Sequence, residues 1–519
     1  MNTAKKIMHE TSLKKLLTGL VPLPDDLPSE FNAKITGIQL DSRRLGRGDL
    51  FMAGFGKNHD ARDYIDYAID HGAAAVLAES GGRWSGLEVR RGVPILVVDN
   101  LSALMSEIAS RFFADPGQHL KLVGVTGTNG KTSCTQFIAQ SLNALGHLCG
   151  VIGTLGYGFR EPMKDTGYTT PDAVVLQSIL AQLLSEHAET VAIEVSSQGL
   201  HQGRVNGVKF DAAVFTNLSR DHLDYHGSMD SYGESKLKLF TRDKLKTAIV
   251  NADDPFATKI LNSLPASVKS YTFSIADKRC DVFASDLQLL PGGYSATVTT
   301  PWGQGQLSGG LLGYFNFSNV LAVLTTVLTL RGDERDFSLA QILAAVSQLK
   351  PVSGRMEIVG GQEDITAVVD YAHTPDALKS ALIALRAHFT GDIWCVFGCG
   401  GNRDQGKRPL MAEVAEQYAN HTIVTDDNPR NESADDIVRQ IMLGVEDKSR
   451  FHVERDRAAA IVMAISKARQ GDVVLIAGKG HESYQDIGGN RMVFSDVSQV
   501  RLALNSRTKS NLAGRHEQE

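Results

Sequence analysis

A glycine-rich turn in the sequence combines residues that could bind phosphate. Lys131 and Thr132 follow Gly127 and Gly130 in the stretch TGTNGKT. Glycines allow bare backbone N–H groups to surround an anion at the positive end of a helix, and a lysine there can reach terminal phosphates. The threonine hydroxyl can serve as a ligand to Mg²⁺. The pattern therefore predicts that the chain binds a nucleotide and Mg²⁺.

The residues around this turn predict the strand and helix that a phosphate loop needs. An apolar run at 121–125 precedes the turn. One apolar helix face follows it, made by Cys134, Phe137, Ile138, Leu142 and Leu145. The loop departs from the common pattern G-x-x-x-x-G-K-[ST], because Val125 stands where that pattern has glycine. A tight turn with a solvated lysine and a nucleotide-dependent switch are the other interpretations.

Three more residues have polar groups that could serve a phosphate site, and each also has a purely structural interpretation. Glu194 lies at the end of a predicted strand, where it could instead form an ion pair. His222, in the run RDHLD, could be a hydrogen-bonded loop histidine, and Lys236, in YGESKLK, is typical of a solvated helix residue. Hard cations prefer oxygen ligands, which favours Thr132 and Glu194 as metal ligands.

Length and composition narrow the class of protein. The 519 residues are too many for one hydrophobic core and predict about three domains. The formal net charge of -6 argues against a broad basic face for nucleic acid. Because no apolar run suits a signal peptide or a membrane span, we expect a cytoplasmic protein without membrane insertion. We also expect a monomer. The five cysteines lack paired metal spacing, so we expect reduced thiols, with Cys395 and Cys399 packed in a core or loop.

Short apolar runs that alternate with helical patterns predict an α/β protein in three domains. We expect a small α/β domain at 1–115, a central P-loop-type ATPase domain with a mainly parallel sheet at 116–350, and a Rossmann-like domain at 351–519. The predicted strands are 34–40, 74–77, 95–98, 121–125, 191–195, 212–216, 367–369, 393–397, 422–425 and 473–477.

Several separated motifs between Leu40 and Gln485 resemble those of the Mur ligase family, which also includes folylpolyglutamate synthases. These motifs are GTNGKT (127–132), EVSSQGLHQGRV (194–205), TNLSRDHLDYHG (216–227), YGESK (232–236), GYFNFSN (313–319), GRME (354–357) and DYAHTPDAL (370–378). A second group is most similar to the family members that use meso-2,6-diaminopimelate: LDSR (40–43), TTP (169–171), GCGGNRDQGKRP (398–409), DNPR (427–430) and GKGHE (478–482).

The resemblance implies an ATP-dependent amide ligase of peptidoglycan precursor synthesis. Such ligases phosphorylate a substrate carboxylate with ATP, and an amine then attacks the acyl phosphate. The implied reaction adds meso-2,6-diaminopimelate to the D-glutamate of UDP-N-acetylmuramoyl-L-alanyl-D-glutamate. The alternatives are the same reaction with L-lysine and a folylpolyglutamate-synthase-like reaction, against which the N-terminal UDP-binding domain and DNPR count.

The resemblance also implies a role for individual residues. The implied catalytic residues are Lys131, Glu194, His222 and Lys236. The implied metal-site residues are Thr132, Glu194, His222 and Lys236, the last carbamylated to N6-carboxylysine. ATP contacts are implied for Gly127, Thr128, Asn129, Gly130, Lys131, Thr132, Ser133, Asn316, Asn319, Arg355, Asp370 and His373. UDP-substrate contacts are implied for Leu40, Ser42, Thr169, Thr170, Ser196, Gln202 and Arg204, and the family usually has a glycine at the position of Ala61 in NHDAR (58–62). Amino-acid contacts are implied for Arg403, Asp427, Asn428, Pro429, Arg430, Gly478 and Glu482.

The arginine of DNPR favours diaminopimelate over lysine. A planar guanidinium such as that of Arg430 can hold the distal carboxylate through two parallel N–H bonds, whereas lysine has no such carboxylate. Lysine-adding relatives lack the arginine in this motif. The carboxylates of Asp427 and Glu482 would serve the amines. The structural alternative is a loop arginine paired with Asp426 or Glu432.

Overall fold

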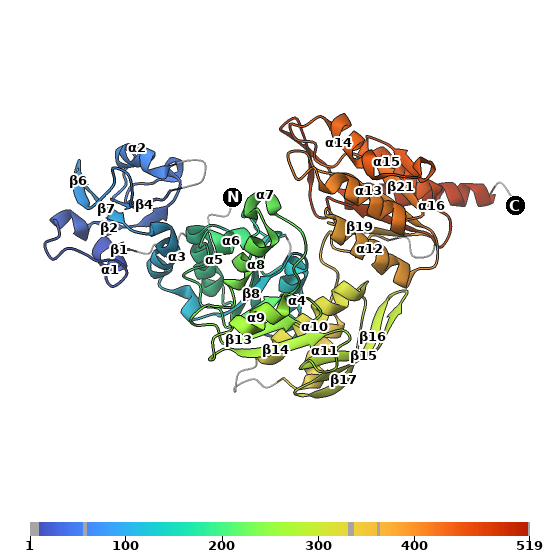
Figure 1. Cartoon of the computed structure of the whole chain (residues 1–519), viewed down its shortest axis with the longest axis horizontal. Helices are drawn as coiled ribbons and strands as arrows, with labels where there is room; N and C mark the ends of the chain where they lie inside the picture. The colour runs from blue at the N-terminus through green and yellow to red at the C-terminus, as the bar shows by residue number, and fades with distance from the viewer. Residues whose placement is uncertain (1–9, 56–59, 161, 331–336, 361–363, 517–519) are drawn as a thin grey trace.

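Three separate β-sheets organise the chain into an N-terminal, a central and a C-terminal unit, which follow one another in Figure 1 from blue to red. The computed structural model describes residues 10–55, 60–160, 162–330, 337–360 and 364–516, with side chains up to Thr508. The predicted α/β architecture with mainly parallel sheets is confirmed. Among the helices of the described residues, none is long and apolar enough to cross a membrane.

The N-terminal unit is a five-stranded sheet with small helices. Its strand order is β3-β4-β5-β7-β6, parallel except for β6. The strands are β3 (Gly37–Gln39), β4 (Asp49–Ala53), β5 (Ala75–Glu79), β6 (Leu87–Arg90) and β7 (Val93–Val98), with a separate pair β1 (Thr11–Ser12) and β2 (Lys34–Ile35). The helices are α1 (Leu13–Leu17), α2 (Ile65–Asp70) and α3 (Leu101–Phe112). Two apolar clusters form its core.

The central unit is built on a ten-stranded sheet of order β10-β9-β11-β8-β12-β13-β14-β15-β16-β17. Its strands are β8 (Lys121–Thr126), β9 (Cys149–Gly153), β10 (Gly156–Gly158), β11 (Thr190–Glu194), β12 (Ala212–Phe215), β13 (Thr247–Asn251), β14 (Lys269–Ser274), β15 (Val282–Leu290), β16 (Gly293–Thr300) and β17 (Gly303–Gly309). Strands β9, β11, β8, β12, β13, β14 and β15 run parallel. The last three strands form an antiparallel meander that the sequence did not reveal.

Helices cover this sheet and complete two large apolar clusters. They are α4 (Lys131–Ala144), α5 (Ala173–Ser185), α6 (Ser197–His201), α7 (Leu223–His226), α8 (Met229–Leu237), α9 (Ala257–Ser263), α10 (Tyr314–Thr329) and α11 (Leu339–Ser347). Helix α4 follows the phosphate loop as predicted, with Cys134, Phe137, Ile138 and Leu142 buried. Strand β11 is buried along its whole length and β8 from Leu122 onwards, so packing on both faces of the sheet fixes the position of its carboxyl end.

The C-terminal unit has a six-stranded sheet of order β18-β19-β23-β20-β21-β22, parallel apart from β18. The strands are β18 (Glu357–Ile358), β19 (Thr366–Asp370), β20 (Ile393–Phe397), β21 (His421–Val424), β22 (Phe451–Val453) and β23 (Val473–Ala477), followed by the hairpin β24 (Tyr484–Ile487) and β25 (Asn490–Val493). The helices are α12 (Pro375–His388), α13 (Lys407–Tyr418), α14 (Ala434–Ile441), α15 (Arg457–Lys467) and α16 (Asp496–His516).

One histidine joins the central and C-terminal units. His388, at the end of α12, accepts a hydrogen bond from the backbone N–H of Gly313 at 2.8 Å through Nε2. Its Nδ1 lies 2.6 Å from the carbonyl oxygen of Leu290 at the end of β15. These two contacts require a proton on Nδ1 and none on Nε2. Burial lowers the pKa of His388, which favours this neutral form.

Candidate active site

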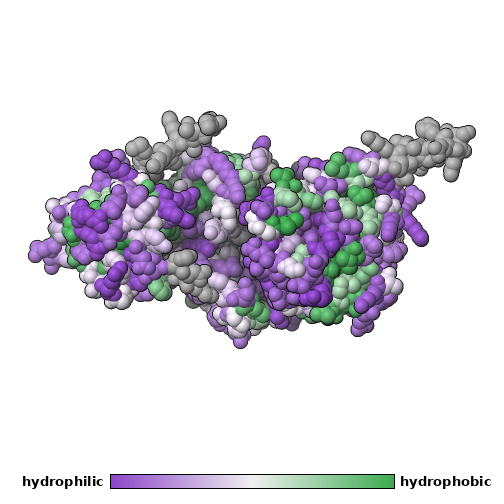
Figure 2. Space-filling view, turned by 90° about the horizontal axis from the view of Figure 1, so that it is seen from above, coloured by the Kyte–Doolittle hydropathy of each residue, from purple (hydrophilic) through white to green (hydrophobic). Residues whose placement is uncertain are grey.

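A cleft of about 530 Å³ opens between the carboxyl end of the central sheet and the C-terminal unit. Strands β8, β9, β11 and β12 end at it, as expected for a ligand site at the carboxyl edge of a parallel sheet. Figure 2 shows a hollow with largely hydrophilic walls between the two ends of the molecule. The cleft is lined by fifteen of the sequence-predicted site residues: Thr128, Asn129, Gly130, Lys131, Thr132, Ser133, Thr169, Glu194, Ser196, His222, Lys236, Asn319, Arg355, Asp370 and His373.

The phosphate loop has the backbone that an anion site needs. Gly127 and Gly130 have φ of 152° and 84°, and a Cβ on them would lie 1.9 Å from Thr216 Oγ1 and 2.5 Å from Asn319 Oδ1. Helix α4 starts at Lys131 without a side-chain cap, so its first N–H groups face the loop. The Nζ of Lys131 donates to the carbonyl oxygens of Gly127 and Thr128 at 2.8 and 2.7 Å. The loop therefore has the positive helix end that phosphate would occupy.

Glu194 is a buried carboxylate held by neutral donors rather than by a cation. It is 1% exposed at the end of β11 and accepts from Thr132 Oγ1 at 2.9 Å. Thr154, which follows β9, donates to it through its backbone N–H at 2.9 Å and its hydroxyl at 3.1 Å. The ion pairs of the described residues do not include Glu194, so the ion-pair interpretation is wrong. Thr154 was missed from the sequence, although it follows a strand at the same edge as Glu194.

Thr154 also links this carboxylate to the predicted substrate residues. Its hydroxyl lies 3.0 Å from that of Thr169. Thr170 donates to the carbonyl oxygen of Glu194 at 2.7 Å and to Ser196 Oγ at 3.0 Å. Polar groups thus lead from Thr132 of the phosphate loop through the carboxylate and the carbonyl oxygen of Glu194 to Thr170 and Ser196.

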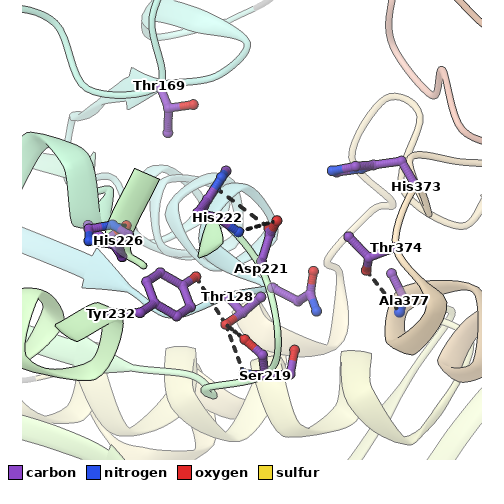
Figure 3. A network of polar contacts seen from close by, with 12 residues as sticks. Thr128, Thr169, Ser219, Asp221, His222, His226, Tyr232, His373, Thr374 and Ala377 are labelled. Atoms are coloured by element: carbon purple, nitrogen blue, oxygen red, sulfur yellow. Dashed lines mark hydrogen bonds and ion pairs between the residues drawn. The ribbon is translucent and has the colours of Figure 1, made fainter. Parts of the chain in front are cut away.

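His222 and Asp221 lie next to each other at the cleft. The Nε2 of His222 lies 3.5 Å from Asp221 Oδ2, and Figure 3 shows them on the side opposite His373 of the C-terminal unit. Burial lowers the pKa of His222 below its ordinary value, and burial lowers that of His373 to about 4. Although burial acts against ionisation, the nearby His222, His373 and Lys131 hold the pKa of Asp221 below its ordinary value. Asp221 lies inside the motif at 216–227, but nothing in its residue type or spacing distinguished it from the other acids there.

Lys236 is buried, so the interpretation as a solvated helix residue is wrong. It is 1% exposed on α8, and its Nζ donates to the carbonyl oxygen of Gly127 at 2.8 Å. Its ammonium also lies 4.4 Å from the ring centre of Tyr232. Burial and the nearby Lys131 place the pKa of Lys236 well below its ordinary value. Tyr232 in turn contacts Thr128, with 3.2 Å between their hydroxyls (Figure 3).

Arg355 reaches from the C-terminal unit across the cleft to the phosphate loop. Its Nη2 lies 3.4 Å from Thr132 Oγ1, and its guanidinium stacks 4.3 Å above the ring centre of Tyr371. Asn319 lines the cleft beside Gly130, whereas Asn316 is buried and donates to the carbonyl oxygen of Leu312 at 2.9 Å. Asn316 therefore supports the start of α10 in this conformation.

The predicted UDP-substrate residues lie in two places. Thr169 and Ser196 line the cleft, whereas Thr170 is buried next to Ser196. Arg204 Nη1 donates to the carbonyl oxygen of Thr170 at 2.6 Å. Gln202 accepts from Arg204 at 2.9 and 2.7 Å. Leu40 and Ser42 lie in the N-terminal unit, just beyond β3. Ala61 begins a short helical turn, but Asn58 of the same motif lies outside the described residues.

The residues predicted to bind the added amino acid lie beyond the carboxyl ends of β20, β21 and β23, outside the lining of the cleft. Asp427, Asn428 and Pro429 are buried, Arg430 and Glu482 are half-buried, and Arg403 is exposed. A Cβ on Gly478, whose φ is 118°, would lie 2.7 Å from Asp427 Oδ2. A side chain at this position would therefore collide with the carboxylate of Asp427.

Arg430 does not pair with either of the two acids considered from the sequence. Its Nη1 donates to the carbonyl oxygen of Gly401 at 2.9 Å. Asp426 pairs instead with Arg455 at 2.6 Å, and Glu432 pairs with the fully buried Arg408 at 2.6 and 2.8 Å. The loop-pair interpretation of Arg430 is therefore wrong, and its charge is not neutralised by these neighbours.

The donor set around Glu194 fits Mg²⁺. Glu194 and Thr132 supply buried oxygen atoms next to the phosphate loop, and hard cations prefer oxygen ligands. No group of three or more His, Cys, Asp and Glu side chains in the described ranges could hold a metal by itself. Phosphate oxygens would have to complete the coordination, as is usual for Mg²⁺ at nucleotide sites. Cys395 and Cys399 are both buried without a disulfide, in agreement with packing roles.

Three family models match the chain. They are "Mur ligase family, catalytic domain" at residues 34–113, "Mur ligase middle domain" at 125–327 and "Mur ligase, glutamate ligase domain" at 354–480. Two curated proteins named UDP-N-acetylmuramoyl-L-alanyl-D-glutamate--2,6-diaminopimelate ligase are similar over most of their length. The one from Coxiella burnetii is 46% identical over 91% of this chain and 96% of its own. The one from Pseudomonas aeruginosa is 44% identical over 92% and 96%.

Solved structures agree at the level of the fold. A structure of a ligase with the same name has a TM-score of 0.71 and 36% identity, and the match covers 96% of this chain and 99% of that one. Mycobacterium tuberculosis folylpolyglutamate synthase complexed with ADP and AMPPCP has a TM-score of 0.61 at 18% identity, covering 72% of this chain and 92% of its own. The second likeness concerns the fold alone.

Proposed function

This chain belongs to the Mur ligase family, and we propose that it adds meso-2,6-diaminopimelate to UDP-N-acetylmuramoyl-L-alanyl-D-glutamate in peptidoglycan precursor synthesis. The reaction is ATP-dependent and forms an amide bond between the D-glutamate carboxylate and an amine of the added amino acid. The curated relatives carry this activity in their names, which confirms the function predicted from the sequence. We further propose that the enzyme acts in the cytoplasm.

The observation that carries the chemistry is the continuous row of polar groups from the phosphate loop to Ser196. Loop N–H groups and Lys131 would bind the triphosphate, and Thr169, Thr170 and Ser196 would hold the end of the dipeptide. A carboxylate placed there lies next to the terminal phosphate, so phosphoryl transfer to it becomes intramolecular. Transfer of the terminal phosphoryl group from ATP to the carboxylate forms the acyl phosphate and leaves ADP, and attack of the amine on the acyl phosphate forms the amide and releases inorganic phosphate.

Several side chains would bind or neutralise the negative charges that take part in phosphoryl transfer. Thr132 and Glu194 would bind Mg²⁺, which neutralises phosphate charge. Lys131 must leave the carbonyl oxygens of Gly127 and Thr128 to reach the nucleotide, and Arg355 enters from the C-terminal unit. Lys236 would contribute as a carbamate, because its lowered pKa leaves a neutral amine that can react with CO₂. His222 would lie beside it.

The amino acid would enter from the C-terminal unit. Arg430, whose charge is not neutralised by neighbouring acids, would hold the distal carboxylate of diaminopimelate, and Asp427 and Glu482 would face its amines. Since this group lies outside the lining of the cleft, the C-terminal unit must approach the central unit for the amine to reach the acyl phosphate. Closure would also exclude water, which would otherwise hydrolyse that intermediate.

A product assay tests the proposal. The purified protein is given ATP, Mg²⁺, the UDP-muramoyl dipeptide and either diaminopimelate or L-lysine, and the product mass is measured. We expect product with diaminopimelate and phosphate release only when both the dipeptide and the amino acid are present. A preference for lysine would overturn the specificity, and turnover of ATP without the other substrates would favour a nucleotide switch. Lys131→Ala should abolish turnover.

A further inference from the structure

A fully buried lysine contacts two of the residues predicted to bind the added amino acid. Lys479 follows Gly478 at the end of β23 and is 0% exposed. Its Nζ donates to Asn428 Oδ1 at 3.0 Å and to Glu482 Oε2 at 2.9 Å. The ring centre of Tyr484 lies 5.6 Å away. A buried ammonium is costly unless it is paired, so these contacts are needed wherever the lysine is charged.

The contacts of Asn428 fix which way its amide faces. Its Oδ1 accepts from Lys479 and also from the backbone N–H of Asp486 at 2.9 Å. With two donors on the oxygen, the amide nitrogen must face the other way, and it donates to Glu482 Oε2 at 2.7 Å. Rotation of this amide by 180° would place its NH₂ group against two donors. Lys479 and the N–H of Asp486 therefore select the orientation of Asn428 together.

The same arrangement leaves one oxygen of Glu482 available. Oε2 accepts from both Lys479 and Asn428, whereas no hydrogen bond within the described residues reaches Oε1. The side chain of Glu482 is 18% exposed, so the free oxygen has access to solvent. Asp427 Oδ2, which lies over Gly478, is a second acceptor on the same group of loops. Two acceptors are what the two amines of diaminopimelate require.

We propose that Lys479 is a positioning residue for amino-acid recognition, holding Glu482 and Asn428 so that Glu482 Oε1 receives an amine of the substrate. This inference depends on the proposed function, since it names the groups that bind the added amino acid. Lys479 itself touches no substrate. It acts through Glu482, and it joins the loop after β23 to the DNPR loop after β21.

A purely structural role is the competing interpretation. Lys479 and Glu482 are three residues apart in one turn, and the N–H of Glu482 donates to the carbonyl oxygen of Lys479 at 2.9 Å. If the ion pair only closes this turn, its loss should lower stability without selecting one substrate. If Lys479 acts through Glu482, its loss should matter only while Glu482 is present. A double-mutant cycle separates these cases.

The experiment measures KM for each substrate in Lys479→Met, Glu482→Gln and the double variant, with Lys467→Met on the exposed face of α15 as the matched control. We expect each single change to raise KM for diaminopimelate about tenfold or more, while KM for ATP and the dipeptide stay within about twofold. The double variant should be no worse than the poorer single variant. An unchanged KM in Lys479→Met, or effects that multiply in the double variant, would overturn the proposal.

Two further results separate misfolding of a variant, or failure of the proposed function, from failure of this inference. If Lys479→Met does not fold, the double variant, which has no unpaired buried charge, is compared with Glu482→Gln alone. Equal KM values for diaminopimelate in these two proteins support the proposal, and a KM about tenfold higher in the double variant overturns it. If the wild-type protein makes no product with diaminopimelate, the proposed function itself fails. If it does, and Lys479→Met behaves like Lys467→Met, only this inference fails.

Discussion

The Nζ of Lys236 lies 2.8 Å from the carbonyl oxygen of Gly127, so a buried lysine on α8 is hydrogen-bonded to the first glycine of the phosphate loop. The same carbonyl oxygen also accepts from Lys131 at 2.8 Å. Two lysine Nζ atoms therefore share one acceptor, and the repulsion that a charged Lys236 would meet from Lys131 adds to burial in lowering the pKa of Lys236. A carbamate on Lys236 would keep an N–H for Gly127 and replace the repulsion by attraction.

Replacing Lys236 should therefore impair catalysis rather than folding. We expect Lys236→Met to lower kcat about 100-fold or more, in the range found when a preorganised charged group is removed from an active site. Lys238→Met, two residues along on an exposed position, is the control and should retain activity. Removing dissolved CO₂ should lower wild-type activity, and bicarbonate should restore it. A Lys236→Met enzyme with normal kcat would exclude this role.

The sequence predicted the strands that are buried on both faces, because such strands appear as uninterrupted apolar runs. Strands β20 and β23 have the predicted bounds. The meander β15 to β17 was missed, because its strands alternate buried and exposed positions in glycine-, threonine- and glutamine-containing stretches. Nothing in the local sequence separates such strands from surface loops.

The site was predictable where a residue ends a buried strand and unpredictable where tertiary packing decides its environment. Glu194 belongs to the first kind, since its strand places it at the sheet edge. Lys236 belongs to the second, because its helix is polar in sequence and becomes buried only by packing over the loop. Lys479 is similar, since its partner Asn428 is 51 residues distant in the chain.

Arg430 should control the choice of amino acid. We expect Arg430→Lys to raise KM for diaminopimelate about 10- to 100-fold, because an ammonium cannot make the two parallel bonds of a guanidinium. KM for ATP should change little, since Arg430 lies outside the cleft that contains the phosphate loop. Arg439→Lys on α14, where the arginine is exposed and pairs with Asp436, is the matched control. Equal losses for both substrates would mean that Arg430 supports the fold instead.

The buried ion pair between Arg457 and Asp496 should hold the C-terminal unit together. Both side chains are 0% exposed, with Nη2 and Oδ2 2.7 Å apart. Arg457→Met leaves a buried carboxylate unpaired, so we expect a loss of about 3 to 5 kcal/mol in the free energy of unfolding of this unit. Breaking the exposed pair with Arg439→Met should cost less than about 1 kcal/mol.

Tryptophan fluorescence can follow this unit alone. Each unit has one tryptophan, Trp84, Trp302 and Trp394 in chain order, so replacing the first two by phenylalanine leaves a reporter in β20. Urea unfolding of that variant, with and without Arg457→Met, gives the change in the free energy of unfolding of the C-terminal unit. Coincident transitions for the two proteins would show that the buried pair contributes nothing.

Acid should destabilise the C-terminal unit through histidines that are buried in the neutral form. Burial lowers the pKa of His373 and of His481 to about 4, from an ordinary value of 6.5. Between these values the unfolded chain binds protons that the folded chain does not, so stability is fully present above about pH 6.5 and falls as the pH decreases towards 4. Unfolding of the Trp394 reporter protein at a series of pH values should show this slope. His481→Phe should make the slope shallower by removing one titrating group, and an unchanged slope would show that this histidine binds protons equally in the folded and the unfolded chain.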